Sequence, residues 1–541
     1  MKRLPSVSPL GGCHLSHCSG CPAAPSRRAF LSTAGLAAAG VLAAPRLIAS
    51  AGAKTRIRIV YALHGETQEV PDWPNKGFDF RPVMARINEA VARGCPDCEF
   101  LPTLATGEEQ AKKIVEADAA AGIDGYLVYQ MNCWNRVVQT MAATGKPVLY
   151  ADFQFAGSGG FLVYTAALLR AQAPNVGFVA SSRLEDLVEA VKCFPRAAQG
   201  GSAAFVAAVT RARVATTPSS GQLWREASAS RVSRGASASR DKPDSLTTLP
   251  IADCVRHLKE SKILAVRGKA EGLPRDTMGI QVAHVPFAEV NDAWKAADRE
   301  ESRAVAGRWQ KAAARVEGVS FETLETSAAM YLGMKSLLKK HGAVAITMDC
   351  LGGFYGGHIH AYPCLGFHEL NNEALVGACE CDVRSTATMV AGTLLTRGRP
   401  GYISDPVIDT SKRQIIYAHC VASNRPFGPR GPSNPFEILT HSEDRQGASV
   451  RSVLPAGYMT TTLEFEASRK EVLFHQARAV GNDPDDRACR TKLCAEPVGD
   501  LEKLFTMWDQ WGWHRVTFYG DLKEPVYALA DALGYKVVEE A

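Results

Sequence analysis

The stretch Ala374-Leu375-Val376-Gly377-Ala378-Cys379-Glu380-Cys381-Asp382 decides the fold that we predict for this chain. It is a mainly apolar run that ends in two carboxylates, Glu380 and Asp382. From Val383 to Leu395 the apolar residues then recur at the spacing of one helical face. A strand that passes directly into a helix places its last residues at the carboxyl edge of a sheet, where open α/β folds bind ligands. Glu380 and Asp382 are therefore candidate site residues, and the alternative for Asp382 is a plain helix N-cap.

The chain around this stretch is long enough for several domains. Its 541 residues exceed what one hydrophobic core supports, and this length predicts about three domains. Hydrophobic residues make up 46% of the chain and charged residues 22%, values that are typical of an ordinary soluble globular protein.

The N-terminal segment resembles a signal for the twin-arginine (Tat) translocase. Ser26-Arg27-Arg28-Ala29-Phe30-Leu31 carries the paired arginines, and an Ala-rich, weakly apolar stretch runs from Leu31 to Ala44. Ala49-Ser50-Ala51 then offers a cleavage site of small residues. We therefore expect residues 1–51 to be a signal peptide, the Tat translocase to be a partner during export, and the mature protein to be periplasmic or otherwise exported. The alternatives are a chance match and a retained anchor.

The formal net charge of the chain, +5, resides entirely in this segment. Residues 1–51 contain five basic residues and no acidic one, so the mature chain is close to neutral. A near-neutral chain lacks the basic surface that binds a phosphate backbone, and we expect no nucleic acid among its partners.

The pattern of strands and helices predicts an α/β fold in several parts. From residue 55 to 199, buried strands such as Ile57–Leu63 alternate with amphipathic helices, which indicates a parallel sheet. Residues 200–248 are rich in Ser, Ala, Thr and Arg, and we interpret them as a flexible insertion, with a functional basic arm as the alternative. Residues 249–400 predict a second α/β domain. Residues 401–541 contain shorter strands and turns, which predict a β-rich C-terminal domain.

The predicted fold class is therefore α/β, with two parallel-sheet domains of the Rossmann or flavodoxin type followed by a barrel-like β-rich domain that completes the site. Asp405 ends a short apolar run 25 residues after Glu380. A strand–helix–strand unit of that length would place both carboxylates at one sheet edge. His419 and His514 each lie at the end or start of a predicted strand. Two carboxylates with one or two imidazoles suit Mn²⁺ or another divalent cation, and the alternative for each histidine is a buried ring bonded to the backbone.

Three motifs of the second half resemble the L-fucose and L-arabinose isomerase superfamily, in which a similar run ends in Glu-x-Asp. The motifs are Pro363-Cys364-Leu365-Gly366-Phe367, Leu370-Asn371-Asn372-Glu373 and Ala378-Cys379-Glu380-Cys381-Asp382. The resemblance is clearest over residues 343–541. It implies an α/β fold, a sugar as substrate, a divalent metal such as manganese and a homo-oligomer.

The resemblance also implies roles for individual residues. Glu380 corresponds to a metal ligand and acid/base group, and Asp405 to its partner carboxylate. His419 corresponds to the additional histidine of the arabinose branch, and His514 to the histidine near the C-terminus of both branches. Cys381 departs from the pattern, because the family often has Gly or Asn there, and its thiol would lie beside the metal.

These roles predict an exported, metal-dependent aldose–ketose isomerase, an intramolecular oxidoreductase that acts through an enediolate. One carboxylate, Glu380 or Asp405, removes a proton from carbon while the other transfers the hydroxyl proton. The sequence does not decide which carboxylate has which role. A metal-dependent lyase or epimerase acting on a keto-sugar would use the same chemistry. A non-catalytic periplasmic sugar-binding protein is the alternative from a different class.

Overall fold

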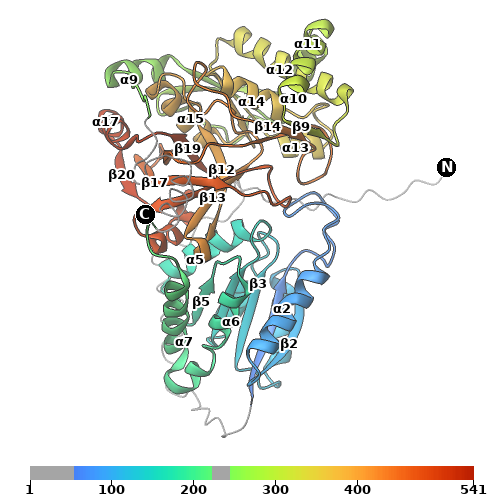
Figure 1. Ribbon diagram of the computed structural model, residues 1–541, viewed down its shortest axis with the longest axis vertical. Coiled ribbons are helices and arrows are strands. Elements are labelled where there is room, and N and C mark those ends of the chain that lie inside the picture. Colours follow the sequence, from blue (N-terminus) through green and yellow to red (C-terminus); the bar gives the residue numbers. More distant parts are fainter. Residues whose placement is uncertain (1–53, 222–243) are drawn as a thin grey trace, which may run out of the picture.

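The computed structural model describes residues 54–221 and 244–541 (Figure 1). The predicted signal peptide, residues 1–51, lies outside the described residues, as does the middle of the predicted insertion, residues 222–243.

The N-terminal domain is a five-stranded parallel sheet with strand order β2-β1-β3-β4-β5. On β1, Ile57 and Ile59 face one apolar cluster while Val60 faces another, because successive side chains of a strand point to opposite faces. Both faces of the sheet are therefore covered, as is usual for parallel sheets. The strands are β1 (Thr55–Ala62), β2 (Cys98–Ala105), β3 (Gly125–Gln130), β4 (Val148–Asp152) and β5 (Val176–Val179), and the helices are α2 (Arg81–Gly94), α3 (Glu108–Asp118), α4 (Val137–Ala142), α5 (Ser158–Arg170) and α6 (Leu184–Val191).

The predicted flexible insertion over residues 200–248 is wrong in its first part, which belongs to helix α7 (Pro195–Thr216). Phe205, Val209 and Arg213 recur every fourth residue and are buried. Arg213 donates to the carbonyl of Phe178 at 2.9 Å, which anchors the helix to β5. The Ala-rich composition that reads as low complexity is also the composition with the highest helix propensity.

The second domain contains the sheet β11-β10-β6-β8-β7, in which only the short edge strand β7 is antiparallel. Together with the first sheet, it confirms the prediction of two α/β domains with parallel sheets. The strands are β6 (Lys262–Val266), β7 (Asp276–Thr277), β8 (Ile280–Val285), β10 (Ala345–Met348) and β11 (Val376–Cys379), and the helices are α9 (Ile251–Glu260), α10 (Phe287–Lys295), α11 (Arg299–Ala312), α12 (Phe321–His341), α13 (Cys350–Tyr355), α14 (Cys364–Asn372) and α15 (Val383–Leu395).

The C-terminal domain is an antiparallel barrel of six strands, which confirms the barrel-like prediction. The strand order is β16-β19-β12-β13-β18-β17, and β17 pairs back with β16 to close the barrel. The barrel strands are β12 (Tyr402–Asp409), β13 (Gln414–His419), β16 (Met459–Glu466), β17 (Glu471–Asn482), β18 (Thr491–Val498) and β19 (Arg515–Tyr519). The remaining elements are the strand β20 (Lys536–Glu539), parallel to β17, the helices α16 (Trp508–Trp511) and α17 (Lys523–Leu533), and the 3-10 turns η1 (Thr410–Lys412) and η2 (Leu501–Phe505).

A hairpin from the C-terminal part of the chain leaves the barrel and joins the second domain. Its strands β14 (Phe436–Leu439) and β15 (Ser449–Ser452) form a three-stranded sheet with β9 (Arg315–Glu317). The two parts of the chain on either side of residue 400 are therefore interleaved.

The barrel lies between the other two domains (Figure 1). One apolar cluster joins barrel residues such as Ile408 and Tyr417 to the first sheet. A second cluster joins barrel residues such as Val407 to the core of the second domain. Val407 and Ile408 are neighbours on β12, so this one strand contributes to both interfaces. The carboxyl end of β11 and the barrel strands consequently meet at the junction of all three domains.

Within the two described segments, no helix is both long and apolar enough to cross a membrane.

Candidate metal centre

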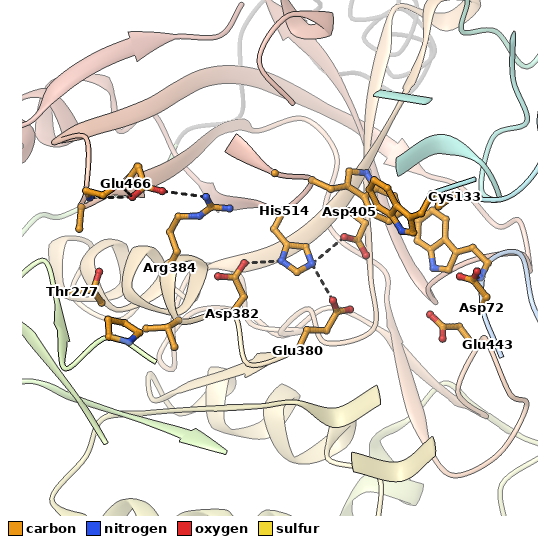
Figure 2. Close-up of a pocket in the computed structure, with 18 of the residues that line it drawn as sticks. Asp72, Cys133, Thr277, Glu380, Asp382, Arg384, Asp405, Glu443, Glu466 and His514 are labelled. Atoms are coloured by element: carbon orange, nitrogen blue, oxygen red, sulfur yellow. Dashed lines mark hydrogen bonds and ion pairs between the residues drawn. The ribbon is translucent and has the colours of Figure 1, made fainter. Parts of the chain in front are cut away.

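The four residues that the sequence singles out lie together at this junction. Glu380 follows the end of β11, Asp405 lies on β12, His419 ends β13 and His514 directly precedes β19. Each side chain offers one ligand atom, and these atoms all lie within 4.8 Å of one another. Figure 2 shows His514 between Glu380, Asp405 and a third acidic residue, Asp382. The group could hold a metal ion.

The spacing of the ligand atoms suits a small divalent cation. The Nε2 atom of His514 lies 3.1 Å from Oδ1 of Asp405 and 3.5 Å from Oε2 of Glu380. The Nε2 atom of His419 lies 3.7 Å from Oε1 of Glu380 and 3.8 Å from Oδ2 of Asp405. Ligands placed about 2.1 Å from one ion at right angles are about 3 Å apart, so a small inward movement would complete the coordination.

Three polar atoms of the site have no hydrogen-bond partner among the described residues, although charged groups lie near them. Both ring nitrogens of His419 and Oδ1 of Asp405 are buried and form no hydrogen bond with the residues that the structure describes. A buried polar atom without a partner costs about 1–3 kcal/mol, and native structures contain few of them. A cation bound by Asp405 and by one ring nitrogen of His419 would remove part of that cost. The donor set therefore fits a metal.

The electrostatics of the site also favour a positive charge. Burial lowers the pKa of His419, but the carboxylates of Glu380 and Asp405 outweigh it and raise this pKa to about 8. The pKa of His514 is raised well above its usual value for the same reason, with Asp405 and Asp382 as the main acidic neighbours. Two imidazoles held among carboxylates in a buried place show that negative potential dominates there.

Asp382 has two functions in this structure. It is the N-cap of α15 and accepts from the backbone N–H of Ser385 at 3.0 Å, which confirms the capping prediction. Its Oδ2 atom also lies 2.8 Å from Nδ1 of His514. This contact fixes the ring so that Nε2 faces Glu380 and Asp405, the way a carboxylate commonly orients a metal-binding histidine. The helix cap and the bond to His514 therefore occur together in one residue.

The backbone at the end of β11 is strained. Glu380 and Cys381 have φ values of 63° and 53°, a left-handed conformation that costs a non-glycine residue about 1 kcal/mol or more. The N–H of Cys381 donates to the carbonyl of Met348 at 2.9 Å, which holds the turn. The side chain of Cys381 packs with Ala265 and Val383, and within the described residues Cys381 is not among the candidate metal ligands.

The geometric reason that we gave for pairing Glu380 with Asp405 is wrong, although the two residues do meet. Glu380 and Asp405 do not lie at one sheet edge, because β11 belongs to the second parallel sheet and β12 to the barrel. The helix between them, α15, packs against both β11 and β12 and so brings their ends together.

A cavity of about 560 Å³ opens over the candidate metal ligands. Trp73 and Trp134 come from the N-terminal domain, and Trp513 precedes His514. The centroid of the Trp513 ring lies 4.9 Å from that of Trp73 and 6.0 Å from that of Trp134, in edge contacts. The sequence interpretation missed all three residues. Only Trp513 offered a signal, because it adjoins a candidate ligand.

The position of Trp513 depends on a glycine in the first turn of α5. A Cβ atom at Gly159 would lie 2.6 Å from the Trp513 ring, closer than real carbon contacts allow. We expect Gly159→Ala to lower the free energy of unfolding by about 1–3 kcal/mol, because either the ring or the helix must move. Thermal unfolding monitored by tryptophan fluorescence measures this change. Gly307→Ala is the control, since a Cβ at Gly307 in α11 meets no atom within 4 Å and the change should stabilise the helix slightly. Equal behaviour of the two variants would contradict the packing argument.

The fold and the site together define an α/β protein with a closed barrel and a candidate divalent-metal centre at the junction of its domains. The chain matches no model of a protein family. Over 268 residues it is 25% identical to the sulfoquinovose isomerase of Clostridium sp. (strain MSTE9). The aligned part covers 48% of this chain and 58% of the relative, so the chain spans less than two thirds of the relative's length. This is a distant similarity to a sugar isomerase.

Proposed function

We propose that the protein is an exported, metal-dependent sugar isomerase that interconverts an aldose and a ketose through an enediolate. The observation that carries the proposal is the group of two carboxylates and two imidazoles beside a cavity of about 560 Å³, in which the ring nitrogens of His419 and Oδ1 of Asp405 have no hydrogen-bond partner among the described residues. The distant similarity to a sugar isomerase supports it. The resemblance of residues 343–541 to the L-fucose and L-arabinose isomerase superfamily supports it further.

The proposed chemistry assigns separate tasks to the residues of the site. A divalent ion such as Mn²⁺, held by Glu380, Asp405, His419 and His514, would supply a Lewis acid for the oxygens on C1 and C2 of an open-chain sugar. The side chain of Glu380 is 17% exposed and that of Asp405 only 6%. Glu380 is therefore better placed to take a proton from a sugar carbon, and Asp405 to hold the hydroxyl proton.

The cavity walls favour an uncharged sugar. Trp513 and the two tryptophans from the N-terminal domain offer rings for the apolar face of a sugar. Among the described residues that line the cavity, Arg384 is the only lysine or arginine. Its guanidinium lies 3.3 Å from Glu464 and 3.3 Å from Glu466, and it donates to the carbonyl of Trp511 at 2.6 Å. An anionic sugar would therefore find carboxylates rather than an available cation.

The experiment that tests the proposed function is product analysis with the purified mature protein. The protein is incubated with Mn²⁺ and a panel of aldoses and ketoses, and the products are identified by NMR in heavy water. Formation of the partner ketose or aldose, with deuterium at C1 or C2, is the expected result. If the products are shorter fragments, the activity is that of a lyase. If the product is an epimeric sugar, the activity is that of an epimerase. Sugar binding without turnover would indicate a binding protein.

Export is a separate part of the proposal and rests on Arg27 and Arg28 in the N-terminal segment. We expect the double change Arg27→Lys, Arg28→Lys to abolish export, because the translocase reads the arginine pair. Fractionation of expressing cells, followed by immunoblotting, measures the periplasmic and cytoplasmic pools. Arg46→Lys, a basic residue beyond the apolar stretch, should be exported normally. Normal export of the double variant would refute the assignment.

A further inference from the structure

A second cavity, of about 320 Å³, lies away from the candidate metal centre. It is located at the carboxyl ends of β3, β4 and β5, and one of its walls is α2. Among the described residues, none lines both cavities. Ligands of open α/β folds bind at the carboxyl ends of parallel strands, so this position is favourable for a small molecule. The volume is sufficient for one monosaccharide-sized ligand.

One wall of this cavity is aromatic. The rings of Phe78 and Phe153 both line it, with their centroids 6.2 Å apart. The guanidinium of Arg487, from the barrel domain, lies 4.8 Å from the centroid of Phe153. Aromatic rings of this kind stack against the C–H face of a sugar ring or against another planar group.

Two arginines, Arg86 and Arg487, line the cavity. Arg86 projects from α2, is exposed and forms no ion pair with any residue in the described ranges. Arg487 uses Nε and Nη2 to bind Asp485, at distances from 2.6 to 3.2 Å, and within residues 54–221 and 244–541 its Nη1 has no hydrogen-bond partner. Two arginines with available N–H groups in one cavity are suited to an anionic group.

Asp152, the only acidic residue that lines this cavity in the described part of the chain, does not cancel that charge. It is 3% exposed, and it accepts from the hydroxyl of Ser158 at 2.9 Å through Oδ2. Its other oxygen, Oδ1, is buried and has no hydrogen-bond partner among the described residues. Burial and the nearby Asp409 raise the pKa of Asp152 to about 8, against the opposing effects of Ser158 and Arg487. The carboxyl group is therefore mostly neutral at pH 7 and can act as a hydrogen-bond donor.

We propose that this cavity is a second binding site, and that it takes an anionic carbohydrate such as a sugar acid or a sugar phosphate. Phe78 and Phe153 stack on the sugar ring, and Arg86 together with Nη1 of Arg487 binds the anionic group. The site also connects two domains. The side-chain amide of Gln154, which lines the cavity, donates to the carbonyl of Ile408 on β12 at 3.2 Å. A ligand there contacts both the N-terminal domain and the barrel.

The proposal is tested by isothermal titration calorimetry of the full mature chain at pH 7. The probes are D-glucuronate, D-glucose 6-phosphate, D-glucose and inorganic phosphate. Glucuronate or glucose 6-phosphate is expected to bind with a stoichiometry of one, at least about tenfold more tightly than glucose or inorganic phosphate, because only these two combine a sugar ring with an anionic group. Binding of only one of the two identifies the anionic group as carboxylate or phosphate and supports the shared chemistry.

Three variants locate the binding. Arg86 is exposed, and Arg86→Ala should weaken binding about tenfold. Arg93 is another exposed arginine of α2 and pairs with Glu89, and Arg93→Ala should leave binding unchanged. Glu380→Gln should also leave it unchanged, which separates this site from the metal centre. The proposal is overturned if neither anionic sugar binds, if inorganic phosphate or glucose binds equally well, or if Arg86→Ala has no effect. Loss of binding in Glu380→Gln would place the ligand in the metal cavity and equally overturn it.

Discussion

Replacement of Glu380 by glutamine is expected to reduce kcat/KM for sugar isomerisation by about a thousandfold or more. The change keeps the size and polarity of the side chain but removes a basic oxygen that no amide can replace. General acid–base catalysis contributes about 10²–10⁴-fold, and loss of one charged metal ligand adds to that. The backbone at Glu380 has a φ of 63°, which glutamine tolerates no worse than glutamate, so the fold should persist. Initial rates at saturating Mn²⁺ and the metal content by mass spectrometry measure the two effects.

The control for this variant is Glu373→Gln. Glu373 is an exposed carboxylate seven residues before Glu380, and it pairs with Lys335 at 3.0 Å on the surface. Its replacement should change neither activity nor metal content, because exposed ion pairs contribute little and the amide oxygen of glutamine can still accept from the hydroxyl of Tyr331. Full turnover by Glu380→Gln with normal metal content would refute the proposed roles, whereas equal losses in both variants would point to a general effect on folding.

The features of the fold that the sequence predicts are those encoded by local patterns. The apolar run that ends at Cys379, followed by the helical spacing after Val383, correctly predicts β11 and α15. The closure of the barrel is harder to predict from the sequence, because it depends on the pairing of β16 with β17 and β19 and not on the pattern within any one strand. The hairpin β14–β15 pairs with β9, which lies more than a hundred residues earlier in the chain, and no local sequence pattern predicts this pairing.

The same distinction separates the predicted from the missed parts of the site. Glu380, Asp405, His419 and His514 could be proposed because each ends or begins a strand and because their order resembles that of a known superfamily. Trp73 and Trp134 could not, since they reach the cavity only when the N-terminal domain packs against the barrel. The bond between Asp382 and His514 joins residues 132 positions apart, and an acidic N-cap gives no sign of its distant partner.

Because Asp382 holds His514, we expect Asp382→Asn to lower the affinity of the site for its metal ion. Asparagine caps a helix about as well as aspartate, so α15 should retain its N-terminus. The amide lacks the negative charge that holds Nδ1 of His514 at 2.8 Å and strengthens Nε2 as a ligand. Loss of such a supporting carboxylate typically reduces metal affinity about 10–100-fold. Competition with a fluorescent chelator measures the affinity for Mn²⁺ directly.

The activity of Asp382→Asn should depend on the metal concentration in a way that a purely structural defect would not. At limiting Mn²⁺ the rate should fall in proportion to the lost affinity, and excess Mn²⁺ should restore most of it, because Glu380 and Asp405 remain in place. Asp349→Asn is the matched control. Asp349 caps α13 by accepting from the N–H of Gly352 at 3.2 Å and has no ion pair with any histidine within the described residues, so its replacement should leave the metal affinity unchanged. If excess metal fails to restore Asp382→Asn while the helix content is normal, Asp382 contributes to the reaction itself and not only to the orientation of His514.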